Sequence, residues 1–340
     1  MVYGAIDLHS RFSQIRLVDA EGAVVRERRV ETRRDRLVSA FADVGDVRIL
    51  VEASTESEWV AGALEAAGYE VIIADPNYAA MYGTRQRRIK TDTRDVAALA
   101  EACRLGIFRR AHRVSPAQRA VRQQLAVRRQ LVQMRTALIS QVRALLRREG
   151  LRLRSGSSTS VVDRVAQLEV PAPLRAVLTP VLEALTALGP VIARTTRTLE
   201  QQADTDAVAV RLQSVPGVGP IVALTFRATL DDVARYPSAG HVSSALGLVP
   251  SEDSSGERCR RGHITKLGSR EARAMLIQAA WTHWRSRRVR TAPLRAWADH
   301  LAARRGRRIA VVALARRLSR ILFALWRDDS VFRSAAPVAA

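Results

Sequence analysis

The sequence predicts an α/β domain at the N-terminus, a long helical region in the middle and a mainly helical domain at the C-terminus. Short apolar runs alternate with turn and helix-cap signals over residues 1–112. Long helical apolar patterns with few breakers fill residues 113–206, and shorter helical patterns fill residues 207–330. Residues 331–340 are expected to form a tail.

Five strands are expected in the first domain, and helices separate the last three of them. The expected strands cover residues 2–8, 14–18, 23–30, 47–51 and 71–74, and the expected helices cover residues 33–42 and 57–67. Thr32 is placed to cap the first of these helices. Three strands in meander followed by alternating helices and strands is the order of the ribonuclease-H-like fold.

Four carboxylates stand where such a fold would hold a metal ion. Asp7 ends the first strand and Glu52 ends the fourth. Asp92 and Asp95 open a later helix, and their spacing of three puts them on one face. Clustered acids repel one another unless a divalent cation neutralises them, and oxygen ligands suit Mg²⁺. Two-metal phosphodiester chemistry uses such a set, whereas Asp92 alone has an alternative role in stabilising the helix N-terminus.

A basic run at residues 84–90 lies just ahead of that helix. Its cations are Arg85, Arg87, Arg88 and Lys90. Beside a carboxylate cluster they would hold a nucleic-acid backbone over the metal ions. A solvated loop is the alternative interpretation.

The net charge predicts a polyanionic partner. The 340 residues include 55 Lys and Arg against 33 Asp and Glu, which gives a charge of +22 and a pI near 11.5. Nucleic acid is the natural partner at this charge. No uninterrupted apolar run approaches the roughly 18 residues of a membrane span, so no membrane association is expected. The first residues lack the features of a signal peptide, and a cytoplasmic location is expected.

Two long helices are expected in the middle region. Ser115 and Pro116 predict a helix start, and no breaker follows until Gly150. Its apolar seam is predicted to be Leu131, Met134, Leu138, Val142 and Leu145. A second helix has heptad spacing from Leu174 to Leu199, with interruptions at Pro180 and at Gly189-Pro190. A kinked coiled coil, antiparallel or intermolecular, would serve as connector and dimerisation element.

The C-terminal domain contains two segments suited to phosphate. In the first, Val215-Pro216-Gly217-Val218-Gly219-Pro220 leads into an apolar helix whose first amides can face a phosphate. In the second, Ser254 and Ser255 precede Gly256. Four cations follow them, Arg258, Arg260, Arg261 and Lys266. A hydroxyl nucleophile beside neutralising charges suits phosphoryl transfer, and a solvated basic loop is the alternative.

These motifs together make the chain resemble the transposases of the DEDD insertion-sequence family, the bridge-RNA-guided serine recombinases. The matching segments are AIDLHS, VEAS, ADPNYAAMYGTRQRRIKTDTRDVAALAEACRLG, SVPGVGPIVAL and SALGLVPSEDSSGERCRRGHITKLGSREARAMLIQAAW. Two departures are VEASTESEWV, which lacks a glycine often found soon after the glutamate, and the prolines of the second long helix.

The resemblance implies a RuvC-like domain at residues 1–112, a coiled-coil connector at 113–206 and a transposase domain at 207–330. It assigns Mg²⁺ binding to a DEDD set, and the members of this set are Asp7, Glu52, Asp92 and Asp95. It gives the nucleophile position to Ser255 rather than Ser254.

The predicted function is DNA transposition, in which strands are cut and rejoined. The resemblance further implies that the protein binds donor and target DNA and a structured noncoding bridge RNA. It also implies a homo-oligomer, a dimer or tetramer, in which the serine of one subunit completes the acid site of another. Two alternatives are open. A metal-dependent junction resolvase would need only the acids and water, and a noncatalytic RNA-binding scaffold would need neither cluster.

Overall fold

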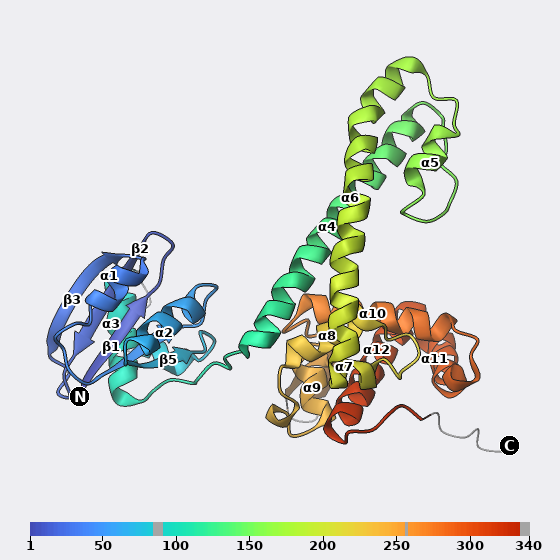
Figure 1. Cartoon of the computed structure of the whole chain (residues 1–340). Helices are drawn as coiled ribbons and strands as arrows, with labels where there is room; N and C mark the ends of the chain where they lie inside the picture. Colours follow the sequence, from blue (N-terminus) through green and yellow to red (C-terminus); the bar gives the residue numbers. More distant parts are fainter. Residues whose placement is uncertain (84–90, 256–257, 334–340) are drawn as a thin grey trace. The chain divides into compact units, whose positions relative to one another are not determined.

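The computed structural model describes residues 1–83, 91–255 and 258–333, with the backbone alone for residues 254, 255, 258, 259 and 261. The chain divides into two compact units, Met1–Arg113 and Val114–Ala340, each with its own hydrophobic clusters. The first is drawn in blue to teal and the second in green to red (Figure 1).

A five-stranded sheet forms the centre of the first unit. Its strands are β1 (Val2–Asp7), β2 (Phe12–Val18), β3 (Val24–Glu31), β4 (Val47–Glu52) and β5 (Glu70–Ala74). Their order in the sheet is β3-β2-β1-β4-β5. The first three strands pair antiparallel, and β4 pairs parallel to both β1 and β5. The predicted succession of three strands, then alternating helices and strands, is confirmed.

Helices cover this sheet because its central strands are apolar on both faces. The helices are α1 (Arg34–Ser39), α2 (Ser57–Ala66), the short 3₁₀ helix η1 (Ala79–Tyr82) and α3 (Asp92–Leu105). Neighbouring residues of a strand point to opposite faces, so Ile49 joins the cluster under α1 and α2 while Leu50 joins the cluster under α3.

One predicted cap of the first unit is wrong. The N-cap of α1 is Arg33, which makes no side-chain capping bond. The Thr32 hydroxyl instead donates to the carbonyl of His9 at 2.7 Å. Thr32 therefore ties the end of β3 to the chain just after β1.

The second unit begins with a helical hairpin (Figure 1). It consists of α4 (Pro116–Arg148), α5 (Val161–Ala166) and α6 (Ala172–Thr205). Ser115 caps α4 as predicted, because its hydroxyl accepts from the amide of Gln118. Four of the five buried residues of α6 recur every seven positions, at Leu178, Leu185, Ile192 and Leu199, and the fifth is Ala203. This confirms the predicted heptad spacing, whereas the coiled coil itself stays a prediction.

Two details of the hairpin differ from the prediction. Met134 is 46% exposed, and the buried seam of α4 runs instead through Leu125, Ile139, Val142 and Leu146. Leu138 and Ile139 are adjacent and both apolar, so the sequence alone does not show which of them is buried in the seam. The predicted interruptions of α6 are also wrong, since one helix continues through both Pro180 and Pro190. Both prolines are exposed, so water can satisfy the carbonyls that lose a helical partner.

The helical body follows the hairpin. Its elements are α7 (Ala207–Leu212), α8 (Pro220–Leu230), η2 (Val233–Arg235), α9 (Ala239–Ala245), β6 (Pro250–Ser255), β7 (Arg258–Ile264), α10 (Arg270–Arg285), η3 (Val289–Thr291), α11 (Ala292–Arg305) and α12 (Arg307–Arg327). Its core includes Leu314, Leu318 and Leu322 of α12, all fully buried. Ser269 caps α10, because its hydroxyl accepts from the amide of Ala272 at 3.2 Å. The β6–β7 pair was not predicted.

One helix of the described chain, α6, is long and apolar enough to cross a membrane. Length and composition alone are weak evidence, because helices of water-soluble proteins meet the same criterion. Leu178, Leu185 and other apolar residues of α6 contribute to the cluster that α6 shares with α4.

Candidate functional site

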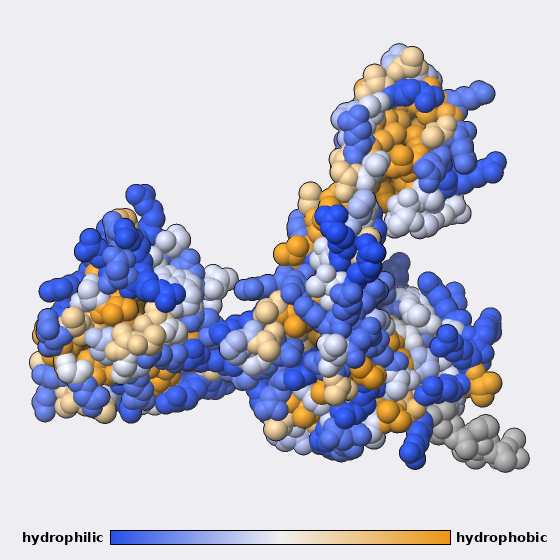
Figure 2. Space-filling model, in the orientation of Figure 1, coloured by the Kyte–Doolittle hydropathy of each residue, from blue (hydrophilic) through white to orange (hydrophobic). Residues whose placement is uncertain are grey.

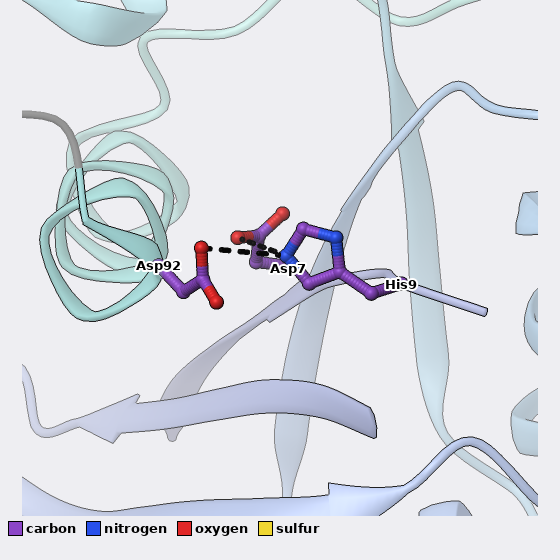
Figure 3. Close-up of side chains that lie close together, drawn as sticks. All are labelled: Asp7, His9 and Asp92. Atoms are coloured by element: carbon purple, nitrogen blue, oxygen red, sulfur yellow. Dashed lines mark ion pairs between the residues drawn. The ribbon is translucent and has the colours of Figure 1, made fainter. Parts of the chain in front are cut away.

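Three ligand-type side chains meet at the end of β1. Asp7 is the last residue of β1, and Asp92 is the first residue of α3. His9 Nε2 lies between them, 3.3 Å from Asp7 Oδ2 and 3.6 Å from Asp92 Oδ1 (Figure 3). One ligand atom from each residue lies within 4.8 Å of the others. The fold thus brings together two carboxylates and an imidazole from segments more than eighty residues apart.

Electrostatic repulsion is already present in this group. Burial raises the pKa of Asp7, and the nearby charges of Asp92 and Asp95 raise it further, while His9 lowers it. A carboxylate whose charge is disfavoured by burial and by like charges gains most from a cation. A divalent ion at this position would therefore lower the pKa of Asp7 and hold it ionised.

The other two predicted acids lie close by but outside the close group. Glu52 ends β4, which pairs with β1 so that Ile6 is opposite Val51. Its Oε2 accepts a hydrogen bond of 2.8 Å from the hydroxyl of Tyr82. Asp95 lies one turn along α3 from Asp92 and near enough to Asp7 to raise its pKa.

The donor set fits a divalent metal ion. Carboxylate oxygens are the ligands of Mg²⁺, and one imidazole nitrogen also suits Mn²⁺ and related ions. Asp7 ends a strand, Asp92 begins a helix, and Glu52 ends the neighbouring strand. One side of this group is open to solvent, since the side chain of Asp92 is 66% exposed. The arrangement can hold an ion that a phosphate also reaches.

Sequence reasoning missed His9 and Tyr82. The signal for His9 was its spacing, because residues two apart in an extended chain point to the same side. Tyr82 carries no local signal. It reaches Glu52 only because η1 follows β5, the strand next to β4.

The stretch with the predicted nucleophile forms a two-stranded antiparallel ribbon, β6 and β7. In its backbone Ser255 is opposite Arg258, and Ser254 is opposite Cys259. The side chains of Ser255, Arg258 and Arg261 lie outside the described residues. Arg260 and Lys266 are exposed. The serine is thus placed next to the connection of a strand pair, in a different unit from the acids.

The basic run predicted to hold nucleic acid over the metal lies outside the described residues. It comprises Arg85, Arg87, Arg88 and Lys90. Its role stays a prediction.

The glycine-rich loop before α8 is fixed by a buried histidine. His283 of α10 is fully buried, and its Nδ1 lies 2.6 Å from the carbonyl of Pro216. Burial lowers the pKa of His283, which keeps the ring neutral, so Nδ1 carries a proton and donates. Gly217 has a φ of 95°, and a Cβ there would lie 2.8 Å from the backbone nitrogen of His283. The loop is therefore held tightly against α10.

The positive charge is concentrated in the second unit. Residues 1–113 contain 18 Lys and Arg against 17 Asp and Glu, and residues 114–340 contain 37 against 16. The first unit is nearly neutral and the second carries +21. Polyanion binding is therefore expected mainly on the helical unit.

Comparisons with known proteins match both units. A family model for DEDD transposases of the IS110 type matches residues 5–149, and the model of the transposase IS116/IS110/IS902 family matches residues 209–294. The probable family 20 transposase of Pseudomonas aeruginosa is 30% identical over 334 residues, 96% of this chain and 97% of its own length. The transposase for insertion sequence element IS1111A of Coxiella burnetii is 28% identical over 336 residues, 97% and 91% of the two chains.

Both family models and these relatives identify the chain as a transposase, an enzyme that cuts and rejoins DNA, and the group of Asp7, His9 and Asp92 could hold the metal ion of such an enzyme. A DEDD domain implies that the enzyme uses a divalent metal ion. The chain belongs to the IS116/IS110/IS902 family of transposases.

Proposed function

We propose that this transposase cuts and rejoins DNA through a covalent phosphoserine at Ser255, with Mg²⁺ held by a four-carboxylate set. This set comprises Asp7, Glu52, Asp92 and Asp95. The observation that carries the metal half is the close group of Asp7, His9 and Asp92. The serine half is supported by the Ser-Ser-Gly motif with its following cations and by its position inside the segment matched by the transposase model, residues 209–294.

The proposed reaction exchanges one phosphodiester bond for another. The Ser255 hydroxyl forms a bond to phosphorus while a bond from phosphorus to a strand oxygen breaks. The serine loses its proton and the departing oxygen gains one, so no external energy source is needed for rejoining. A bound Mg²⁺ supplies stabilisation of the charge on the transferred phosphoryl group. The nearby cations Arg258, Arg260, Arg261 and Lys266 position the phosphates.

Substrates and assembly are part of the same proposal. The first unit is proposed to be a RuvC-like domain, supported by its strand order. A structured bridge RNA and donor and target DNA are the proposed ligands, supported by the +21 charge of the second unit. A homo-oligomer, dimer or tetramer, is supported by exposed apolar side chains on the hairpin, and action in the cytoplasm is part of the same proposal. These side chains include Val127, Met134 and Val177, which are 56%, 46% and 55% exposed.

Separate substitution of the two clusters tests the proposal. Ser255→Ala and Asp92→Asn are each expected to abolish strand cleavage of DNA carrying the element's ends, while nucleic-acid binding persists. Ser254→Ala is the matched control and should still cleave. Cleavage by Ser255→Ala but not by Asp92→Asn would point to a metal-dependent resolvase that uses water. No effect of either change would point to a noncatalytic scaffold.

A further inference from the structure

The far end of the helical hairpin contains a cationic cleft separate from both the acids and the serine. It lies between the last turns of α4 and the segment that follows them, and it has a volume of about 700 Å³. Arg143 and Arg147 of α4 and Arg152 of the following segment line it, together with Leu151 and Leu153. Figure 2 shows hydrophilic residues beside an apolar patch at this end of the hairpin.

The arginines of α4 are used differently along the helix. The helix contains eight arginines and no acidic residue between Pro116 and Arg148. Near its start, Arg122 donates to the carbonyls of Ala228 and Thr229, and Arg129 pairs with Glu271 at 2.9 Å. These arginines fasten the hairpin to the helical body.

The arginines of the cleft do not fasten the hairpin to the helical body. Within the described part of the chain, Arg143, Arg147 and Arg152 form no ion pair and no side-chain hydrogen bond. Interaction with the helix dipole accounts for a basic residue in the last turn of α4, at about 0.3–1 kcal/mol. It does not account for Arg152, which lies beyond the helix, or for the convergence of three cations on one cleft.

The cleft is built into the fold rather than formed by loose side chains. Arg164 of α5 donates to the carbonyls of Arg154, Ser157 and Ser160 and so closes the segment after the cleft into a fixed loop. The amide of Leu151 bonds to the carbonyl of Leu146 at 2.9 Å. The backbone that carries Arg152 is therefore fixed relative to α4, which lowers the entropic cost of binding an anion.

We propose that this cleft binds the phosphodiester backbone of a nucleic acid and does so without reading sequence. Guanidinium groups match phosphate oxygens in geometry and charge. No aromatic, amide or carboxylate side chain lines the cleft among the described residues, so base stacking and base-edge recognition have no partner there. The inference rests on the nucleic-acid substrate of the proposed function and adds a binding site to it.

The position of the cleft gives it a distinct consequence. Arg143 lies 14 residues beyond Arg129, the arginine that pairs α4 with the helical body, which corresponds to about 21 Å at 1.5 Å per residue. A nucleic acid held at the cleft is contacted about that far beyond this ion pair. The hairpin would therefore lengthen the protected segment of bound nucleic acid.

The test compares two triple variants of the full-length protein that lose equal charge. One is Arg143→Ala/Arg147→Ala/Arg152→Ala, and the control is Arg33→Ala/Arg34→Ala/Arg36→Ala on the exposed first turn of α1. Affinity is measured over a range of KCl concentrations for a duplex DNA and a duplex RNA, each of about 40 base pairs, roughly four helical turns. Thermal unfolding verifies that both variants are folded.

The cleft variant is expected to lower the slope of log affinity against log salt by about 2–3, since each lost phosphate contact removes about 0.9. The α1 control should keep the wild-type slope, and Arg143→Lys/Arg147→Lys/Arg152→Lys should largely restore it. A change confined to the DNA or to the RNA arm identifies which nucleic acid the cleft holds. Equal slopes for the cleft variant and wild type would overturn the cleft proposal alone. Failure of the wild-type protein to bind either duplex would overturn the proposed function as well.

Discussion

The two units of this transposase divide charge unequally. In Met1–Arg113 most of the positive charge is balanced, and arginines such as Arg48, Arg104 and Arg113 pair with glutamates of the same unit. In the second unit α4 and α12 contain arginines but no acidic residue. The +22 of the chain is thus almost entirely a property of the helical unit.

The uneven charge suits the two units to different ligands, a metal ion and a phosphate backbone. A carboxylate site binds a metal ion best when nearby arginines do not neutralise its charge, and no ion pair to an arginine involves Asp7 or Asp92 in the described part of the chain. A phosphate backbone is bound best by many unpaired cations. The first unit, in which charge is balanced, suits a metal site, and the basic second unit suits a nucleic-acid backbone.

Packing provides the largest measurable contrast between the units. Ile49 is fully buried in a central strand, and Ile49→Ala should lower the free energy of unfolding of the first unit by about 3–5 kcal/mol. Ile139 is 7% exposed and lies on a single helical seam. Ile139→Ala should therefore lower the free energy of unfolding of the second unit by about 2–3 kcal/mol. Met134→Ala is the control and should cost less than about 0.5 kcal/mol. Hydrogen exchange measured separately in each unit checks this, and a larger effect at Met134 than at Ile139 would disprove the observed seam.

Removal of arginines from each unit tests whether the uneven charge governs DNA affinity. Arg317 and Arg320 of α12 are exposed, and Arg317 lies over the ring of Trp297 at 4.8 Å. Arg317→Ala/Arg320→Ala should lower the salt slope of DNA affinity by about 1.8, because about 0.9 is lost with each phosphate contact. Arg33→Ala/Arg36→Ala removes equal charge from the first unit, where both arginines already have acidic partners. Equal losses in the two variants would show that charge distribution does not govern binding.

His9 tests the metal assignment of the first unit. Its Nε2 lies within 3.6 Å of both carboxylates, so it is placed to ligate or orient at the metal site. His9→Ala should weaken Mn²⁺ binding about tenfold, the lower end of the effect of removing a supporting group. Electron paramagnetic resonance of free Mn²⁺ measures this, with His241→Ala in the second unit as control. Unchanged affinity in His9→Ala would remove the histidine from the site.

His283 predicts a smaller, pH-dependent effect in the second unit. Burial lowers its pKa in the folded state, so the unfolded chain takes up the proton first as pH falls. The stabilising contribution of the neutral ring is therefore present above the unfolded pKa of about 6.5 and is lost as pH falls below it. His283→Asn keeps a donor toward Pro216 but does not titrate, and it should flatten the fall in stability between pH 7 and pH 5. An identical pH profile for both proteins would contradict this role.

Much of the fold was predictable from local patterns. Asp7 and Glu52 end strands, and Ser115 caps a helix, as short-range signals specify. The errors arose where tertiary contacts decide. Thr32 bonds to the chain after β1 rather than to α1, and α6 continues through its prolines because they face solvent.

The site was predictable only in part. Carboxylates at a strand end or a helix start carry a positional signal, which led to Asp7 and Asp92. His9 belongs to the close group only because Thr32 and the start of α3 place the chain after β1 beside Asp92, a long-range arrangement. The cationic cleft also depends on the hydrogen bonds of Arg164, which hold the loop at residues 154–160.

A serine of the helical unit and the acids of the sheet unit are proposed to act in one reaction. Trapping a covalent protein–DNA adduct and mapping its position tests this proposal. With wild-type protein and Mg²⁺, digestion followed by mass spectrometry should place a DNA phosphate on Ser255. Ser254→Ala should give the same adduct, and both Ser255→Ala and Asp92→Asn should give none. Strand cleavage by Ser255→Ala without any adduct would contradict the account.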